Sequence, residues 1–385
     1  MKSILFIHQS SELYGSDKTL LLLIKNLDKS RFNSVVILPF EGPLVEEFKK
    51  EGVIVEIAPV LKLYRNLLKP KNAIRFLFEI RESIKVADRL NEKYNFDIIY
   101  SNTLAVLLGI IFAKKKKIKH LWHVHEIIES PSIFKKTFIK LLSLKANSQI
   151  VYNSIATQKF WNTNSSIKEK NTVIWNGLEL DYVQLSTKEI QEIRTNKFNL
   201  TDNGIIIALV GRISRWKGQM VLLEAFNKIA QDYSFIKLVI IGSPPPNQEV
   251  FLHNLENKIT EYQLNDKVIL IPFQDSINDI WQSIDIAVVP STEPEPFGMV
   301  AIEAMLAKKP VIGSNHGGLS EIIVNEETGF LIEPNHPEEL TQKLRKLILN
   351  ESLRIEMGQK GFERVNNNFS VKNYVSSFEA LFNNL

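Results

Sequence analysis

At 385 residues the chain is longer than one hydrophobic core usually supports, so the sequence predicts two domains. Its composition, 44% hydrophobic and 23% charged with no cysteine, is typical of a folded globular protein and excludes disordered chains, disulfide scaffolds, cysteine-ligated metals and thiol nucleophiles. The net charge of +4 hides an asymmetry, because the first 180 residues carry +11 and the remainder −7, which predicts an anionic partner for the first half.

The first half of the chain alternates short apolar runs with amphipathic stretches such as residues 73–90. Several runs are continuously apolar, the pattern of strands that are buried on both faces of a parallel sheet. A capped helix is expected after Gly15, where Ser16 and Asp17 precede a periodic apolar run. Strands that alternate with helices indicate a doubly wound α/β domain. The predicted strands are residues 4–8, 35–38, 53–57, 97–100, 118–124 and 149–152.

The same alternation restarts after a polar, weakly periodic segment at residues 178–201. We therefore expect an N-terminal domain of residues 1–178 and a C-terminal domain of residues 179–369, two facing sheets with a central cleft at the carboxyl ends of their strands. Residues 370–385 have an apolar face at helical spacing and are expected to cross back onto the first domain. The predicted strands of the second domain are residues 205–210, 238–241, 267–271, 286–289, 310–312 and 330–332.

A basic loop flanked by glycines follows the first strand of the second domain. Gly211 ends the strand, Gly218 opens a helix, and the loop between them carries Arg212, Arg215 and Lys217. Backbone N–H groups and the positive helix terminus would share a site with Arg212 and Lys217, which suits a phosphate or diphosphate. Arg215 alone fits a solvated loop equally well. The G-x-G-x-x-G and P-loop patterns are absent from this segment, which excludes the dinucleotide and P-loop interpretations.

Two carboxylates stand eight residues apart after the predicted strand at residues 286–289. Glu295 lies in a loop and Glu303 in the following helix, so both could line one wall of a pocket. Gly298, between them, permits close approach of the backbone to a ligand. Such a pair could bind sugar and ribose hydroxyls through charge-assisted hydrogen bonds. Glu293 competes for the first role, and taken without context two surface glutamates would explain the pattern as well.

Taken in chain order, these motifs resemble glycosyltransferase family 4. The resemblance rests on G-R-x4-K-G at residues 211–218, on E-x7-E with its F-G-M-V core, and on Gly317-Gly318-Leu319-Ser320-Glu321 after the strand at residues 310–312. It covers essentially the whole chain. It implies the GT-B fold of two facing Rossmann-like domains, and retaining transfer from a nucleotide sugar without a side-chain nucleophile.

The resemblance assigns a role to each matching position of the second domain. Arg212 and Lys217 match the pair that grips the donor diphosphate. Glu295 matches the glutamate that contacts the donor sugar, and Glu303 the one that binds the nucleotide ribose. The other donor-binding positions are Phe297, Gly298, Met299 and Val300, where backbone amides approach the sugar and diphosphate, and Pro272 and Phe273, which border the base.

In the first domain, the segment W-H-V-H-E at residues 122–126 resembles a strand-end histidine segment of the family. Its second histidine faces the donor sugar, which assigns His125 to the site and leaves His123 to the core. The first loop departs from the family, because Tyr14-Gly15-Ser16 stands where many members have adjacent glycines. Gly15 still permits close approach of a ligand, and the departure affects donor-sugar or acceptor geometry. The predicted catalytic residues are therefore His125, Arg212, Lys217 and Glu295.

The sequence also bears on location and partners. The longest apolar run, residues 104–113, is too short to span a bilayer and no cleavage site follows residues 1–8, so we expect a cytoplasmic protein. The lysines at residues 114–117 and Lys119 indicate either a solvated helix end or an electrostatic dock for the anionic inner face of a membrane. Residues 134–144 could form an amphipathic interfacial helix. A nucleic-acid partner is not expected, since no recognised binding motif occurs.

The sequence therefore predicts a retaining glycosyltransferase for cell-envelope polysaccharide synthesis. Its donor would be a nucleoside-diphosphate sugar, with UDP-sugar the family's commonest choice, and its acceptor a hydroxyl of a glycan or lipid-linked glycan. No cofactor and no metal are expected, because the family rarely needs a divalent cation and no Asp-x-Asp motif occurs. The alternatives are a GT-B sugar-nucleotide epimerase, which should not need E-x7-E, a much longer phosphorylase, and a non-catalytic nucleotide-sugar or anionic-lipid binding protein.

Overall fold

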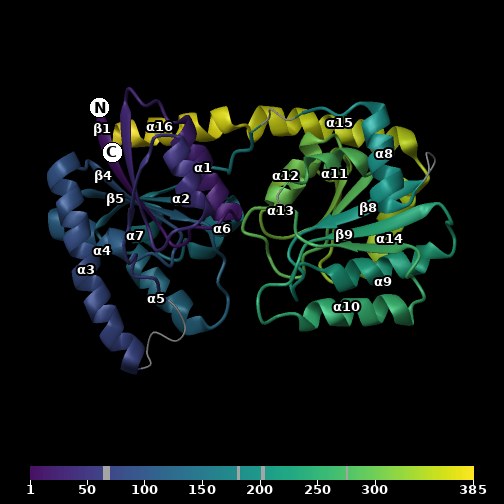
Figure 1. The fold of residues 1–385 in the computed structure, drawn as a ribbon, viewed down its shortest axis with the longest axis horizontal. Coiled ribbons are helices and arrows are strands. Elements are labelled where there is room, and N and C mark those ends of the chain that lie inside the picture. The colour runs from purple at the N-terminus through teal and green to yellow at the C-terminus, as the bar shows by residue number, and fades with distance from the viewer. Residues whose placement is uncertain (64–69, 180–182, 201–203, 275) are drawn as a thin grey trace. The chain divides into compact units, whose positions relative to one another are not determined.

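The computed structural model describes the chain except for residues 64–69, 180–182, 201–203 and 275. The chain divides into two compact α/β units (Figure 1). Unit 1 consists of Met1–Gly177 together with Val371–Leu385, and unit 2 of Leu178–Ser370. The sequence patterns place the corresponding boundaries at residues 178 and 370.

Unit 1 is built around a seven-stranded sheet with the strand order β3-β2-β1-β4-β5-β6-β7. Every neighbouring pair of strands runs parallel. The central strands are buried on both faces, which explains why they appear as continuous apolar runs in the sequence. The strands are β1 (Lys2–His8), β2 (Phe32–Leu38), β3 (Ile54–Ile57), β4 (Ile98–Asn102), β5 (Lys119–Val124), β6 (Asn147–Tyr152) and β7 (Asn171–Val173).

Alternate residues of β1 face two different cores. Ile4 and Phe6 pack with residues of α1, α2 and α16, whereas Leu5 and Ile7 pack with residues of α3 and α4. The sheet is therefore covered by helices on both faces, as a doubly wound domain requires. The helices of unit 1 are α1 (Gly15–Asn26), α2 (Pro43–Lys50), α3 (Pro70–Tyr94), α4 (Leu108–Lys116), α5 (Ser132–Leu142), α6 (Ile155–Trp161), α7 (Ser165–Lys168) and α16 (Val371–Asn384).

The last helix, α16, packs into the core of unit 1 and is yellow in Figure 1. Its Phe378 and Phe382 are fully buried, with ring centres 5.9 and 6.1 Å from that of Tyr100 on β4. Phe382 also meets Phe6 of β1 edge-on at 6.3 Å. The final residues of the chain thus complete the core that its first strand begins.

Unit 2 contains a six-stranded parallel sheet with the order β10-β9-β8-β11-β12-β13. Its central strands β8 and β11 are almost entirely apolar and buried, like those of unit 1. The strands are β8 (Ile205–Val210), β9 (Ile236–Ile241), β10 (Val268–Ile271), β11 (Ile286–Val289), β12 (Val311–Ser314) and β13 (Gly329–Ile332).

The sequence patterns do not predict a helix at the start of unit 2. Residues 178–201 are too polar to show a clear helical period, yet α8 (Thr187–Phe198) forms there with a capping box between Ser186 and Glu189. Buried Arg194 and Phe198 anchor it. The other helices are α9 (Gln219–Ala230), α10 (Val250–Glu261), α11 (Asn278–Ser283), α12 (Met299–Leu306), α13 (Leu319–Ile322), α14 (Pro337–Ile348) and α15 (Glu351–Asn368).

In both sheets the strand order reverses at the first strand of the unit. β1 lies between β2 and β4, and β8 lies between β9 and β11. Ligands of open α/β sheets bind at the carboxyl ends of the strands beside such a switch point. Among the described helices, none is long and apolar enough to cross a membrane.

Candidate active site

The loop after β8 carries the basic residues that the sequence assigns to phosphate. It ends at Gly218, which caps α9 with a φ of 77°, and a Cβ there would lie 1.9 Å from the carbonyl oxygen of Pro290. Glycine is required at this position, because the loop packs directly on the chain that follows β11. The side-chain amide of Gln219 donates to the carbonyl of Arg212 at 2.8 Å and holds the loop together.

Two residues from separate sequence motifs meet beside this loop. Nζ of Lys217 lies 2.6 Å from Oε1 of Glu295, and the hydroxyl of Ser291 donates to the same oxygen at 2.6 Å. The side chains of Lys217 and Glu295 are only 16% and 7% exposed, so solvent screens this pair less than an ordinary surface salt bridge. Nζ also lies 4.5 Å from the ring centre of Trp216. The structure thus joins a predicted cation and a predicted carboxylate that are 78 residues apart.

A third loop, after β12, fixes the backbone of Glu295. Gly318 donates its N–H to the carbonyl of Glu295 at 2.7 Å. A Cβ on Gly317, which has a φ of 60°, would lie 2.3 Å from the same carbonyl oxygen. Nε2 of His316 donates to the carbonyl of Ser291 at 2.9 Å. Loops from β8, β11 and β12 therefore meet at Glu295: Lys217 and Ser291 contact its carboxylate, and Gly317 and Gly318 pack on its backbone.

The F-G-M-V segment, residues 297–300, begins in the core with Phe297 and continues into the start of α12 with Met299. Phe297 is 3% exposed and packs on Phe369 with ring centres 5.9 Å apart, so only its backbone is available to a ligand. Gly298 has a φ of 124°, and a Cβ there would lie 2.7 Å from a methyl carbon of Leu319. Phe297 and Gly298 therefore expose backbone rather than side-chain atoms. The remaining predicted residues on α12, all partly buried, are Met299, Val300 and Glu303.

The other predicted residues of unit 2 lie at the surface. Arg212, Pro272 and Phe273 are exposed, and Phe273 donates its N–H to the hydroxyl of Ser243 at 3.0 Å. Arg215 forms an exposed ion pair with Glu293. Glu293, the competitor for the sugar role, is therefore engaged with a different cation from the one that holds Glu295.

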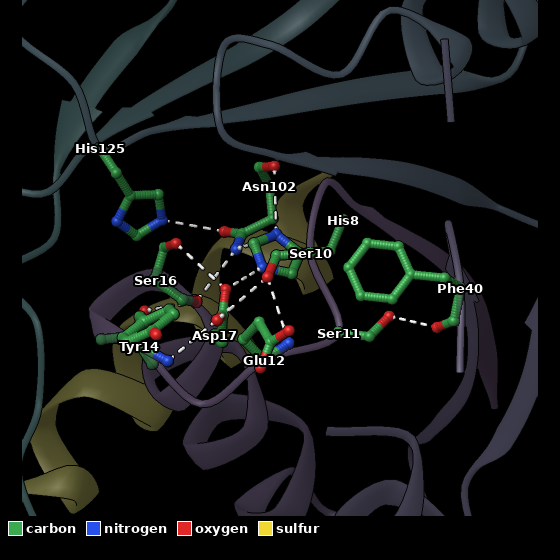
Figure 2. Close-up of polar contacts among 11 residues, drawn as sticks. His8, Ser10, Ser11, Glu12, Tyr14, Ser16, Asp17, Phe40, Asn102 and His125 are labelled. Carbon is green, nitrogen blue, oxygen red and sulfur yellow. Dashed lines mark hydrogen bonds and ion pairs between the residues drawn. The ribbon is translucent and has the colours of Figure 1, made fainter. Parts of the chain in front are cut away.

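In unit 1 the predicted residue His125 directly follows β5 and is 9% exposed. Its Nε2 lies 2.9 Å from Oδ1 of Asn102, which is linked in turn to His8 and Asp17 (Figure 2). Burial, aided by the nearby His8, lowers the pKa of His125 to about 3, so its ring is neutral near pH 7. His123 is fully buried, with its ring centre 3.9 Å from that of His125, and belongs to the core as expected.

The first loop differs from the expected helix start. The sequence predicts a helix capped by Ser16, but α1 begins at Gly15, and the carboxylate of Asp17 accepts the N–H of Tyr14 at 2.9 Å. Asp17 supplies this bond because it stands in the first turn, where backbone N–H groups lack helical partners. A Cβ on Gly15 would meet no atom within 4 Å, so the space beside it is open. Tyr14 is 47% exposed.

The sequence patterns assign no site role to four polar residues that lie in these sites. They are His8, Asp17, Asn102 and Ser291. His8 and Asn102 are register partners at the last positions of β1 and β4, and Ser291 lies two residues beyond β11. A polar residue at the carboxyl end of an otherwise apolar strand is the pattern that could have identified three of them.

The carboxyl of Glu126, next to His125, also has a shifted pKa. Burial raises the pKa of its carboxyl to about 7, although backbone N–H groups of Leu104 and His125 donate to it. This group therefore titrates near neutral pH beside the candidate site. Among the described residues, no group of three or more His, Asp or Glu side chains is arranged to hold a metal ion.

Comparison with known proteins shows which family the chain resembles. Residues 14–182 match the family model Glycosyltransferase Family 4, and residues 190–364 match Glycosyl transferases group 1. The capsular polysaccharide biosynthesis glycosyltransferase CapM of Staphylococcus aureus is 27% identical, over 90% of this chain and 94% of its own length. An uncharacterized glycosyltransferase of Methanocaldococcus jannaschii is 30% identical, over 76% of this chain and 77% of its own.

Solved structures share the architecture over its full length. Anabaena HepE in complex with UDP-glucose has a TM-score of 0.83 at 24% identity and covers 100% of both chains. A glycosyltransferase from Rickettsia africae has a TM-score of 0.84 at 26% identity, over 99% of this chain and 97% of its own. The expected α/β fold class, with two Rossmann-like domains of the GT-B type, is confirmed.

Proposed function

Because the chain belongs to the glycosyltransferases, with a family 4 domain followed by a group 1 domain, we propose that it is a retaining enzyme that moves a sugar from a nucleoside-diphosphate sugar to a hydroxyl acceptor. One observation carries this proposal. The ion pair of Lys217 and Glu295 puts a cation suited to a diphosphate beside a carboxylate suited to sugar hydroxyls, at the carboxyl edge of one sheet.

Lys217 and Arg212 bind the donor diphosphate in this proposal. Their loop leads into the twelve-residue helix α9, whose N-terminus carries a partial positive charge. As the anomeric C–O bond breaks, negative charge builds on the diphosphate, and these preorganised groups stabilise it where it develops. The ammonium of Lys217 has three N–H donors, so it can keep Glu295 and still bind a phosphate oxygen.

Glu295 contacts the donor sugar in this proposal. Its Oε1 already accepts from Lys217 and Ser291, and among the described residues no hydrogen bond engages Oε2. A sugar hydroxyl can therefore donate to Oε2 without displacing either partner. Glu303, partly buried on α12, binds the ribose, and the exposed Pro272 and Phe273 after β10 border the base.

The proposed transfer needs only groups of this chain and the substrates. The bond from the anomeric carbon to the diphosphate breaks, the acceptor oxygen bonds to that carbon on the same face, and the acceptor proton passes to the departing phosphate. The cations at Lys217 and Arg212 supply the charge, so the proposal includes no metal ion and no cofactor. UDP is the proposed carrier, supported by the UDP-glucose complex of Anabaena HepE.

The proposed acceptor is a cell-envelope polysaccharide or a lipid-linked glycan, reached on the inner face of the membrane. CapM, similar over 90% of this chain, is named for capsular polysaccharide biosynthesis. The positive charge of the first half of the sequence favours an anionic lipid surface. Unit 1 would then dock while the protein stays otherwise in the cytoplasm.

The lysines at residues 114–117 are less suitable as a membrane-docking surface than the sequence suggests. They lie at the end of α4, next to the amino end of β5, whereas His125 follows the carboxyl end of the same strand. A membrane bound there would face the edge of the sheet away from the candidate site. Lys115 and Lys116 also pair with Asp88 at 2.6 and 2.8 Å, which neutralises part of their charge.

The helix α5 is the better docking surface, because it follows the carboxyl end of β5. Its Ile133 is 63% exposed, and Lys136 and Lys140 are exposed at positions three and seven residues further, on the same helix face. Replacing Lys136 and Lys140 by Gln should weaken co-sedimentation with anionic vesicles at low salt. Replacing Lys114 and Lys117 by Gln should weaken it less. Equal binding to neutral and anionic vesicles would contradict the docking.

The proposed function is tested by a thermal-shift panel of nucleoside diphosphates and their sugars, followed by a transfer assay. A ligand at 100 times its dissociation constant stabilises the protein by about 2.7 kcal/mol, so a true donor is easily detected. Binding with slow release of free sugar and diphosphate supports a transferase and excludes a passive binding protein. Conversion of the sugar without cleavage from the nucleotide would instead support the epimerase.

A further inference from the structure

A chain of buried hydrogen bonds lies under the first loop of unit 1, as Figure 2 shows. It joins Asp17 to His8 at 2.6 Å, His8 to Asn102 at 3.0 Å, and Asn102 to His125 at 2.9 Å. His8 and Asn102 are fully buried, and Asp17 is 2% exposed. The residues stand at the carboxyl ends of β1, β4 and β5 and in the first turn of α1.

Asp17 sets the direction of the hydrogen bonds at one end of this chain. A carboxylate only accepts, so His8 donates to it through Nε2, which leaves a lone pair on Nδ1 of His8. That lone pair accepts from the side-chain amide of Asn102 at 3.0 Å, a better distance than the 3.5 Å to the Asn102 carbonyl. The amide nitrogen of Asn102 therefore points toward His8.

Ser16 fixes the orientation of Asn102 independently. Its backbone carbonyl, which can only accept, lies 3.2 Å from Nδ2 of Asn102. Both amide hydrogens of Asn102 are then used, and its Oδ1 must accept from Nε2 of His125. The remaining ring nitrogen of His125, Nδ1, holds the lone pair. Within the described residues no hydrogen bond engages that nitrogen.

We propose that Asn102 is a positioning residue for His125. Ser16, and Asp17 acting through His8, fix the orientation of the Asn102 amide. That amide turns the Nε2–H of His125 inward, so the Nδ1 lone pair of His125 is presented to a hydroxyl of the substrate. This inference rests on the proposed function for the nature of the substrate, a sugar. It makes His125 selective, because an acceptor atom binds a sugar that donates a proton there and rejects the deoxy analogue. The low pKa of His125 keeps the lone pair free at neutral pH.

A matched control lies at the other end of β5. Nδ1 of His120 lies 2.7 Å from Oδ1 of Asn147, whose amide nitrogen donates to the carbonyls of Leu141 and Leu142 at 2.8 and 2.9 Å. Both side chains of this pair are buried. Asn147→Leu thus removes the same kinds of hydrogen bond as Asn102→Leu, from the same sheet but the opposite edge.

The test compares these two variants, each alone and combined with His125→Leu, by calorimetry with UDP and UDP-glucose. Asn102→Leu should weaken UDP-glucose binding by about tenfold, the upper range for one neutral hydrogen bond, and leave UDP binding unchanged. In the His125→Leu background it should cause no further loss, because the residue acts through His125. Asn147→Leu should leave both affinities unchanged, as expected for a residue that only stabilises the fold.

A second measurement needs no substrate and separates this inference from the proposed function. The measurement is an NMR spectrum of the histidine ring nitrogens in ¹⁵N-labelled protein at pH 7. The signals of His125 are identified as those that are missing in His125→Leu. They should show that Nε2 of His125 carries a proton and that Nδ1 does not. Absence of UDP-glucose binding in the wild type would remove the proposed donor, and the spectrum would still decide the orientation of His125. Asp17→Asn, of equal shape, replaces Asn102→Leu if that variant does not fold, with a smaller loss expected in the same direction.

Three results would overturn the proposal. The first is a protonated Nδ1 on His125 in the wild-type protein. The second is an equal loss of UDP-glucose affinity in Asn102→Leu and Asn147→Leu. The third is a loss caused by Asn102→Leu that is undiminished in the His125→Leu background.

Discussion

The two units present different chemistry at equivalent edges of their sheets. In unit 1 a buried chain of hydrogen bonds ends in the neutral ring of His125, and in unit 2 three loops hold the ion pair of Lys217 and Glu295. A neutral acceptor suits a hydroxyl, whereas a cation suits a diphosphate. Equivalent sheet edges thus carry a neutral hydrogen-bonding group in unit 1 and a charged pair in unit 2, so removing burial from the first and charge from the second should have different effects.

The largest expected effect concerns the core beneath the edge of unit 1. Phe378 of α16 is fully buried with its ring centre 5.2 Å from that of His123, so Phe378→Ala should lower the free energy of unfolding by about 3–5 kcal/mol. Phe78→Ala is the control, because Phe78 on α3 is 72% exposed and should change it by less than about 0.5 kcal/mol. Urea denaturation measures both. Similar values for the two variants would mean that α16 is a surface appendage.

Charge in unit 2 is tested by Lys217→Ala, which should lower turnover by about 100–1,000-fold without unfolding the protein. Arg212→Ala should act in the same direction. Arg215→Ala is the control, since this cation of the same loop pairs with the exposed Glu293 and not with Glu295. Steady-state kinetics with a circular dichroism check decides the matter. A comparable loss in Arg215→Ala would show that only the summed charge of the loop counts.

The two carboxylates of unit 2 should separate nucleotide from sugar. Glu303→Ala should weaken binding of the free nucleoside diphosphate by about tenfold or more, because a charge-assisted hydrogen bond to the ribose is lost. Glu295→Ala should spare that binding and lower sugar transfer. Calorimetry alongside a transfer assay gives the ranking. The opposite ranking would reverse the roles of the two residues.

The pH dependence of unit 1 should be visible at Glu126. Its pKa in the folded protein is raised to about 7 from an ordinary 4.5, so the folded state holds the proton more tightly than the unfolded state. Stability from this group is present below about pH 4.5 and is lost as the pH rises to about 7. Glu126→Gln should remove that loss, which partial exposure limits to the order of 1 kcal/mol. Parallel stability profiles for the two proteins between pH 5 and pH 8 would contradict this assignment.

The parts of the fold that sequence predicts are those where one local pattern dominates. Buried parallel strands such as β1 and β8 are continuous apolar runs, and their alternation with helices indicates the fold class directly. The helix α8 has a mostly polar surface, so hydrophobic period fails there, and only its capping box between Ser186 and Glu189 marks it. The sequence places the start of α1 too late. The helix begins earlier because the side chain of Asp17 accepts a hydrogen bond from the N–H of Tyr14, a contact that helix propensity does not reveal.

The same distinction applies to the candidate sites. The motifs that contain Lys217 and Glu295 can be seen in the sequence because each is a run of neighbouring loop residues, whereas the roles of the two residues come from the family resemblance. His8 and Asn102 stand out in the sequence only as polar residues at the ends of apolar strands. Their link to each other appears only when strand pairing sets the end of β1 beside the end of β4. Glu293 and Glu295 could not be separated by sequence, and the structure separates them by their different cations.

Titration of nucleoside diphosphates into three proteins tests whether the ion pair of Lys217 and Glu295 marks the binding site of the donor diphosphate. The three proteins are the wild type, Lys217→Ala and Arg215→Ala. At least one of UDP, GDP, ADP and dTDP should bind to the wild type and to Arg215→Ala, and should bind about tenfold or more weakly to Lys217→Ala. Unaltered affinity in Lys217→Ala, or no binding of any of the four to the wild type, would contradict it.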